Sequence, residues 1–297
     1  MDTKKANIMH NSLLHCRRQM LTNFAIRLLT LVCVGGAWNG SFCQQVMAQD
    51  TVPRTAVRQE ALSNASVEVF RQGDRLFLSV QAAGSEAKRV SLPRLYASVR
   101  RWGWSGNQDS KINLIPEPGE WTLEWTQNLP DTKVIELELE SAPDSLEHPP
   151  VIEATADGSI WLAAHQARTE GTRLRYEPQP YKNTVGYWAN AGDFAAWDFQ
   201  IERPGHFAVA ILQGCGAGQG GSDAEITVRQ ENSEVANLPF KVEETGHFQN
   251  FRWRTIGHIE LKNVGRHELK LAAVKIANAA LVDVRAVHLV RQASAQK

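Results

Sequence analysis

The feature that most constrains this chain is a strict alternation of apolar and polar side chains. In EWTLEWT, residues 120–126, Trp121, Leu123 and Trp125 alternate with glutamate and threonine. Successive side chains of a β-strand point to opposite faces of its sheet, so a period of two predicts a strand with one buried face. Similar patterns predict further strands at residues 67–70, 75–81, 134–140, 207–213, 224–229, 250–255 and 281–290.

Turn signals such as Gln72-Gly73-Asp74 and Glu117-Pro118-Gly119 separate these segments. Short strands with a turn every 8–12 residues or so indicate an all-β sandwich or barrel. A polar, proline-rich stretch, SAPDSLEHPP at residues 141–150, interrupts the alternation. We therefore expect an all-β protein with two antiparallel β-sandwich domains, at residues 60–141 and 150–292. A flexible lead at 49–59, a linker at 142–149 and a tail at 293–297 complete this organisation.

The first 48 residues have the features of an export signal. Lys4, Lys5, Arg17 and Arg18 precede an 11-residue apolar core, LLTLVCVGGAW, and Val46 and Ala48 occupy the −3 and −1 places of a cleavage site. A membrane-spanning helix needs roughly 17–25 apolar residues. We therefore expect residues 1–48 to be a cleaved signal peptide, with no membrane insertion after cleavage and a periplasmic or extracellular location.

Charge and cysteine content exclude several classes of function. The chain has 32 basic and 32 acidic residues, but residues 1–48 contain five basic residues and one acidic residue, so the remainder has a net charge of about −4. This charge offers no electrostatic basis for binding nucleic acid. Three of the four cysteines lie in the expected signal, and only Cys215 remains. An intramolecular disulfide and a cysteine metal site are therefore both excluded.

Two motifs have a structural explanation. Residues 216–221, GAGQGG, satisfy G-x-G-x-x-G, but a dinucleotide site needs a helix directly afterwards, and here a strand pattern follows, which predicts a surface loop. Glu136, Glu138 and Glu140 resemble acid/base residues. Their strict alternation with apolar residues instead predicts the solvated face of a strand.

Aromatic residues are concentrated in residues 182–199. Trp197 and Phe194 are expected in a core, as are the indoles of Trp102-Gly103-Trp104. Tyr187 and Trp188 are adjacent, so in a strand they point to opposite faces, and one ring can serve the core while the other serves a ligand. Aromatic rings bind the apolar C–H face of a sugar, and amide or carboxylate groups bind its hydroxyls.

Residues 185–188 (VGYW), 192–194 (GDF) and 204–209 (PGHFAV) follow one another in an order that resembles the jelly-roll carbohydrate-binding modules of families six and thirty-five. The resemblance extends over nearly all of residues 150–292 and implies that this domain is a galactose-binding-like jelly roll. Residues 75–80, 90–93 and 132–137 resemble the C-terminal β-sandwich of family-29 α-L-fucosidases. The catalytic (β/α)₈ barrel of those enzymes, about 250 residues long, is not in this sequence, so no catalytic residue carries over.

The resemblance implies a sugar site with Tyr187 and Trp188 on one side and Phe248 or Trp253 opposite. Asn190, Asp193 and Asn278 are the expected partners of sugar hydroxyls. Such modules often hold a structural calcium ion, for which Glu153 and Asp283 are the candidate ligands. Thr155 stands where the modules have a second glutamate, and Leu281 stands where they commonly have a sugar-binding asparagine.

Together these features lead us to expect an exported, non-catalytic carbohydrate-binding protein, accessory to polysaccharide or glycoconjugate degradation, with a glycoside hydrolase as a partner. Two alternatives belong to other classes. One is an enzyme, an α-L-fucosidase-related protein or a glycosidase subunit. The other is a structural or interaction β-sandwich that has lost its sugar site, which Leu281 favours.

Overall fold

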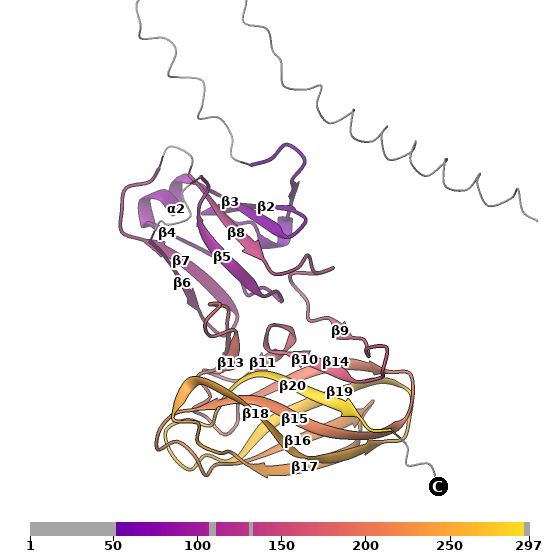
Figure 1. Ribbon diagram of the computed structural model, residues 1–297. Helices are drawn as coiled ribbons and strands as arrows, with labels where there is room; N and C mark the ends of the chain where they lie inside the picture. Colours follow the sequence, from indigo (N-terminus) through magenta and orange to yellow (C-terminus); the bar gives the residue numbers. More distant parts are fainter. Residues whose placement is uncertain (1–51, 107–110, 131–132, 294–297) are drawn as a thin grey trace, which may run out of the picture. The chain divides into compact units, whose positions relative to one another are not determined.

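The computed structural model describes residues 52–106, 111–130 and 133–293 (Figure 1). The described residues form β-strands whose pairings are antiparallel except for one parallel pair, β9 with β14. They also contain one short α-helix, α2 (Ala82–Ala87), and two 3₁₀ turns, η1 (Glu60–Leu62) and η2 (Ala164–Gln166). None of the described helices is long and apolar enough to cross a membrane. The expected signal peptide, residues 1–48, lies outside the described residues. The expected fold class, all-β with antiparallel β-sandwiches and a C-terminal jelly roll, is confirmed.

The first eight strands form two sheets. The five-stranded sheet has the order β1 (Val57–Arg58), β2 (Val67–Gln72), β3 (Arg75–Val80), β8 (Val134–Leu139) and β5 (Val99–Trp104). The three-stranded sheet has the order β4 (Arg89–Pro93), β7 (Glu120–Trp125) and β6 (Ile112–Pro116). Trp121, Leu123 and Trp125 of β7 are all buried, as their alternation predicts. Trp104 is buried as well, with its ring edge-on to Trp125 at 5.1 Å between centroids.

The prediction that Glu136 and Glu138 face solvent is wrong. Each is only 7% exposed, because β8 lies inside its sheet between β3 and β5 and arginines of these neighbours cover its carboxylates. Arg101 donates its Nε–H to Glu138 at 2.6 Å, and this hydrogen bond is the main cause of a lowered pKa at Glu138. Glu140, beyond the strand, is exposed as expected.

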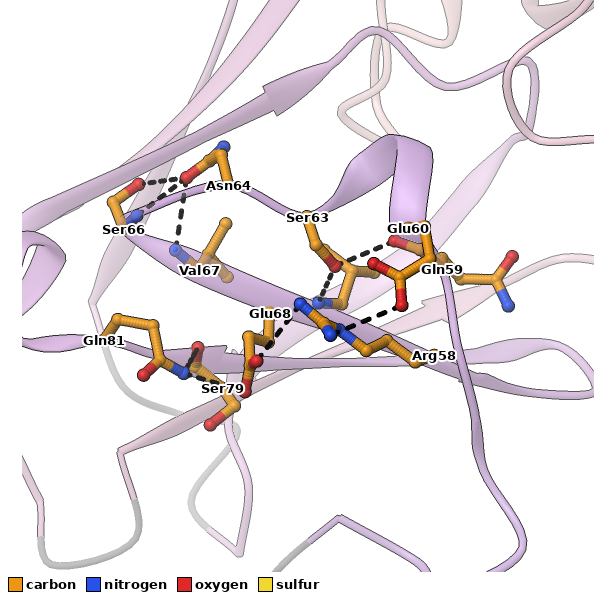
Figure 2. A network of polar contacts seen from close by, with 11 residues as sticks. Arg58, Gln59, Glu60, Ser63, Asn64, Ser66, Val67, Glu68, Ser79 and Gln81 are labelled. Carbon is orange, nitrogen blue, oxygen red and sulfur yellow. Dashed lines mark hydrogen bonds and ion pairs between the residues drawn. The ribbon is translucent and has the colours of Figure 1, made fainter.

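A polar network ties the start of the described chain to its first sheet (Figure 2). Arg58 forms ion pairs with Glu60 at 3.3 Å and Glu68 at 3.2 Å, and the Asn64 carboxamide oxygen accepts hydrogen bonds from the backbone N–H groups of Ser66 and Val67.

Two residues of the expected flexible lead, Val57 and Arg58, form strand β1. Farther along the chain, Leu146 of the expected linker is buried. The division into two domains stays a prediction.

The remaining strands form two sheets that pack face to face (Figure 1). The site sheet has the order β12 (Arg175–Glu177), β13 (Thr184–Gly186), β20 (Asp283–Arg291), β15 (Gly205–Cys215) and β18 (His247–Leu261), with β10 (Ile160–Ala163) paired to β20. The facing sheet has the order β11 (Arg168–Glu170), β14 (Phe194–Ile201), β19 (Gly265–Lys275), β16 (Asp223–Gln230) and β17 (Ser233–Lys241), with β9 (Val151–Ile152) paired to β14.

The core between these two sheets explains the downstream half of the aromatic stretch. Trp197 and Phe199 of β14 are fully buried, as is Phe207 of β15, and the Trp197 indole N–H donates to the Ala163 carbonyl oxygen at 2.8 Å. Phe194, also expected in the core, is only half-buried, with the Lys270 ammonium 4.2 Å from its ring centre. The G-x-G-x-x-G segment forms the loop between β15 and β16, as predicted.

Candidate functional site

The outer face of the site sheet, which points away from the facing sheet, holds a cavity of about 340 Å³. We call it the site cavity. Side chains from β12, β20, the β12–β13 turn, the loop after β13 and the start of β18 line it: Glu177, Lys182, Tyr187, Trp188, Phe248 and Asp283.

Strand register brings Glu177 and Asp283 to this cavity. Val185 pairs with Val284, and both are fully buried in the core, so their neighbours Gly186 and Asp283 face outward. Tyr176, opposite Val185, is also buried, and Glu177 beside it shares the outer face. Gly186 leaves room for both carboxyl groups. A Cβ at this position would lie 2.8 Å from Asp283 Oδ1 and 3.3 Å from Glu177 Oε1.

The two carboxyl groups have different partners. Glu177 forms an ion pair with the Lys182 ammonium. Asp283 is only 7% exposed, and its carboxyl group forms no hydrogen bond or ion pair with any described residue. Burial raises the pKa of Asp283 to about 8, and the nearby charge of Glu177 contributes to the increase. At neutral pH the Asp283 carboxyl group is therefore mostly protonated, and it can both donate and accept a hydrogen bond inside the cavity.

Tyr187 and Trp188 point in different directions, but they lie in the loop after β13 and not in a strand as expected, with Tyr187 in the left-handed region at φ 60°. Tyr187 is 43% exposed, and the Arg175 guanidinium carbon lies 3.4 Å from its ring centre. Trp188 is 1% exposed, and its indole N–H donates to the Asp193 carbonyl oxygen at 3.1 Å. Of this pair, Tyr187 is therefore the exposed ring, with one face covered by Arg175, and Trp188 forms a packed part of the cavity wall.

Phe248 lies on the other side of the cavity, where its ring packs against Gly216. A Cβ at Gly216 would lie 2.7 Å from a carbon of this ring, so the glycine sets the position of the phenylalanine. The structure thus brings together Tyr187, Trp188 and Phe248, three of the four predicted aromatic residues, around one cavity.

The predicted hydroxyl partners lie outside the cavity lining and stabilise nearby loops. The Asp193 carboxylate accepts backbone N–H groups of Thr172, Arg173 and Leu174, each at 3.1 Å. Burial opposes ionisation of Asp193, but these hydrogen bonds outweigh it and lower its pKa. Asn190 donates to the Thr172 hydroxyl at 2.5 Å, and Asn278 donates to the Gly220 carbonyl at 3.0 Å.

Trp253, the fourth predicted aromatic, lies on the outer face of the site sheet but not in the cavity lining. Its ring contacts Trp161 and His288, with centroid separations of 5.4 and 6.4 Å. The β18 pattern does not reveal this neighbour, because Trp161 is 92 positions away in the sequence and reaches Trp253 only through β20 and β15.

The two candidate calcium ligands are not adjacent. Glu153 is exposed and directly follows β9. The turn after it, which contains Ser159, lies at the C-terminal end of β20, because the Arg291 backbone N–H donates to the Ser159 hydroxyl at 3.1 Å. Asp283 begins the same strand, roughly 25 Å away at the usual rise per residue. The described residues contain no group of three or more His, Cys, Asp or Glu side chains arranged for a metal ion. Calcium binding stays a prediction.

Sequence reasoning missed Glu177 and Lys182, and also Arg173 and Gln249, which complete the charged and polar lining. The signal for Glu177 is its place beside buried Tyr176 and opposite a strand that ends in glycine. This signal is readable only once β12 is known to pair with β13. Leu281, which replaces the expected asparagine, is buried, and its backbone N–H donates to the Trp188 carbonyl at 2.8 Å.

Comparisons with known proteins show similarity of fold. No protein-family model matches the sequence, and no curated protein matches it. An α-L-fucosidase from Vibrio sp. strain EJY3 is 14% identical with a TM-score of 0.31, over 77% of this chain and 40% of that chain. A family 35 carbohydrate binding module from Clostridium thermocellum is 18% identical with a TM-score of 0.37, over 45% and 98%. The insecticidal delta-endotoxin Cry8Ea1 from Bacillus thuringiensis is 11% identical with a TM-score of 0.38, over 61% and 30%.

The chain thus spans less than half the length of the fucosidase that it matches. Similarities at these low TM-scores carry no argument about what the chain binds. That argument depends on the cavity itself.

Proposed function

We propose that this protein binds a carbohydrate in the site cavity, without catalysing a reaction, and acts outside the cytoplasm beside a glycoside hydrolase. The observation that carries the proposal is the Asp283 carboxyl group, which is buried at the cavity without a protein partner among the described residues. Its oxygens open onto the cavity rather than onto another protein group, so a bound ligand can exchange hydrogen bonds with them.

The surroundings of Asp283 favour a sugar over other small molecules. Tyr187 and Phe248 provide apolar ring surface for the C–H face of a pyranose, while Glu177, Lys182 and Asp283 provide acceptors and donors for its hydroxyls. Positive and negative groups are both present, so the cavity is not selective for a strongly charged ligand. A neutral or weakly charged saccharide matches this mixed lining.

The carboxyl pair also supports a second candidate, a glycosidase, because a protonated acid beside an ionised one is the usual acid/base arrangement of those enzymes. Glu177 and Asp283, however, approach the same point above Gly186. A glycosidase needs its carboxyl groups on opposite sides of the scissile bond. We therefore expect the purified protein to release no nitrophenol from aryl fucosides or other aryl glycosides, and measurable release would favour the enzyme.

A glycan array probed with the protein lacking residues 1–48 tests the proposal, followed by affinity measurements on two cavity variants. Asp283→Ala and Tyr187→Ala should each weaken binding about 10- to 100-fold, since a hydrogen bond or a stacked ring is worth about 1–3 kcal/mol. Tyr181→Ala is the matched control, because this tyrosine is exposed and does not line the cavity. An array without a single hit, or cavity variants that bind like the unmodified protein, would refute the proposal.

A further inference from the structure

The outer face of the site sheet carries an exposed aromatic cluster away from the cavity. It consists of Trp161 on β10, Trp253 on β18 and His288 on β20. The Trp161 ring lies 5.4 Å from Trp253 and 5.2 Å from His288, measured between centroids. The two tryptophans are 44% and 46% exposed. Such exposed aromatic groups in a soluble sandwich often mark a binding surface.

Register places this cluster on the same face as the cavity. His288 pairs with Trp161 on one side and with Ala210 on the other, and its neighbours Val287 and Leu289 are buried in the core, so His288 points outward. Asp283 lies five residues earlier on the same strand, and plain alternation would turn it inward. An irregularity opposite Leu212, where β20 contains one extra residue, returns Asp283 to the outer face.

The cluster and the cavity are joined by a second aromatic contact. The extra residue of β20 is Arg285, whose guanidinium carbon lies 4.0 Å from the centre of the Phe251 ring. Arg285 also donates to the carbonyl oxygens of Lys182 at 2.7 Å and Tyr181 at 2.5 Å, so the turn that borders the cavity holds it in place. From Asp283 to His288 the paired strand β15 advances four residues, from Gly214 to Ala210, so the face extends about 13 Å along the strand.

We infer that this outer face binds a linear oligosaccharide, with one sugar unit in the site cavity and further units over Phe251, Arg285 and the Trp161–Trp253 cluster. The inference rests on the proposed function and adds the ligand class, a chain of several units rather than a single sugar. Successive pyranose rings present apolar faces that match separate aromatic side chains, and the distance along the strand exceeds the length of one ring. His288 and the N–H groups of Arg285 that do not bind the Lys182 and Tyr181 carbonyls supply donors between the aromatic surfaces.

The test uses affinity electrophoresis of the protein lacking residues 1–48 in gels that contain xylan, galactomannan, hydroxyethylcellulose or laminarin. Xylose, mannose, galactose and glucose are then assayed as free ligands by calorimetry. We expect Trp253→Ala and Trp161→Ala to reduce the affinity for the retained polymer at least tenfold while the affinity for its monosaccharide stays unchanged. Asp283→Ala should reduce both. Val274→Ala is the control, since this exposed residue lies on β19 of the facing sheet.

The outcomes separate the inference from the proposed function. Suppose that Asp283→Ala binds neither the polymer nor the monosaccharide, while both tryptophan variants bind the polymer as tightly as the unmodified protein. The inference about the aromatic cluster is then wrong, and the proposal that the cavity binds a sugar is supported. If no polymer and no monosaccharide binds, both are wrong. Sedimentation velocity adds one further check. A dimer that dissociates on Trp161→Ala or Trp253→Ala would mean that the cluster is a contact between two copies of the chain, which would also overturn the inference.

Discussion

Replacing Asp283 with asparagine gives the most direct test of the cavity's electrostatics. The pKa of this group rises from about 3.9 in an unfolded chain to about 8 in the folded protein. The folded state binds the Asp283 proton more tightly than the unfolded state does. Protonated Asp283 therefore stabilises the fold fully below about pH 4, and this stabilisation is lost as the pH rises through about 8. At about 1.4 kcal/mol per unit of pKa, the upper limit of this loss is about 6 kcal/mol. The cavity opens to water, so we expect about 2–4 kcal/mol.

Urea unfolding of the unmodified protein and Asp283→Asn, from pH 4.5 to pH 8.5, measures this loss. Asparagine cannot ionise, so the variant should gain about 2–4 kcal/mol over the unmodified protein between the two ends of the series. Asp223→Asn is the matched control. Asp223 is half-exposed, and its hydrogen bond and ion pair with Lys241 lower its pKa, so it is already ionised throughout this range.

Equal pH dependence in Asp283→Asn and the unmodified protein would refute the reasoning, because it would mean that Asp283 is ionised and well solvated in the folded state. The series should be run in both EDTA and calcium chloride. A calcium ion bound at Asp283 would keep the carboxylate ionised, so a flat profile in calcium alone would support the calcium prediction.

Three further predictions concern single positions. Trp188→Ala should lower the free energy of unfolding by about 3–5 kcal/mol in urea titrations, because it leaves a cavity where a buried ring was. Tyr187→Ala should change the same free energy by less than about 1 kcal/mol, because this ring is exposed. Equal effects of the two substitutions would contradict the conclusion that Trp188 is buried and Tyr187 exposed. Gly186→Ala should weaken sugar binding, since its Cβ would lie 2.8 Å from Asp283 Oδ1, while Gly192→Ala, with nothing within 4 Å, should bind normally in the same calorimetric assay. Burial lowers the pKa of His165 to about 4. The neutral imidazole therefore stabilises the fold above about pH 6.5, and this stabilisation is lost as the pH falls towards 4. His165→Gln should lose less stability than the unmodified protein at acid pH in the same urea series.

Much of the fold could be predicted from local patterns. The alternation in EWTLEWT places Trp121, Leu123 and Trp125 in a core, and the structure buries all three. The burial of Trp197 and the loop at residues 216–221 also follow from local patterns, because period and turn residues act over a few positions. The same reasoning failed at Glu136 and Glu138. An alternating pattern shows that a strand has two faces, but it does not show that arginines of neighbouring strands cover the polar one.

By itself, then, the sequence determined an all-β chain and the positions of eight of the described strands. Only the tertiary structure decided where the site lies. Glu177 and Asp283 are 106 positions apart, and they meet over Gly186 because β13 lies between β12 and β20. One extra residue in β20 then turns Asp283 outward, onto the face that carries Trp161 and Trp253. The physical reason is that side-chain alternation is a local property, whereas pairing and register depend on non-local hydrogen bonds that join distant segments.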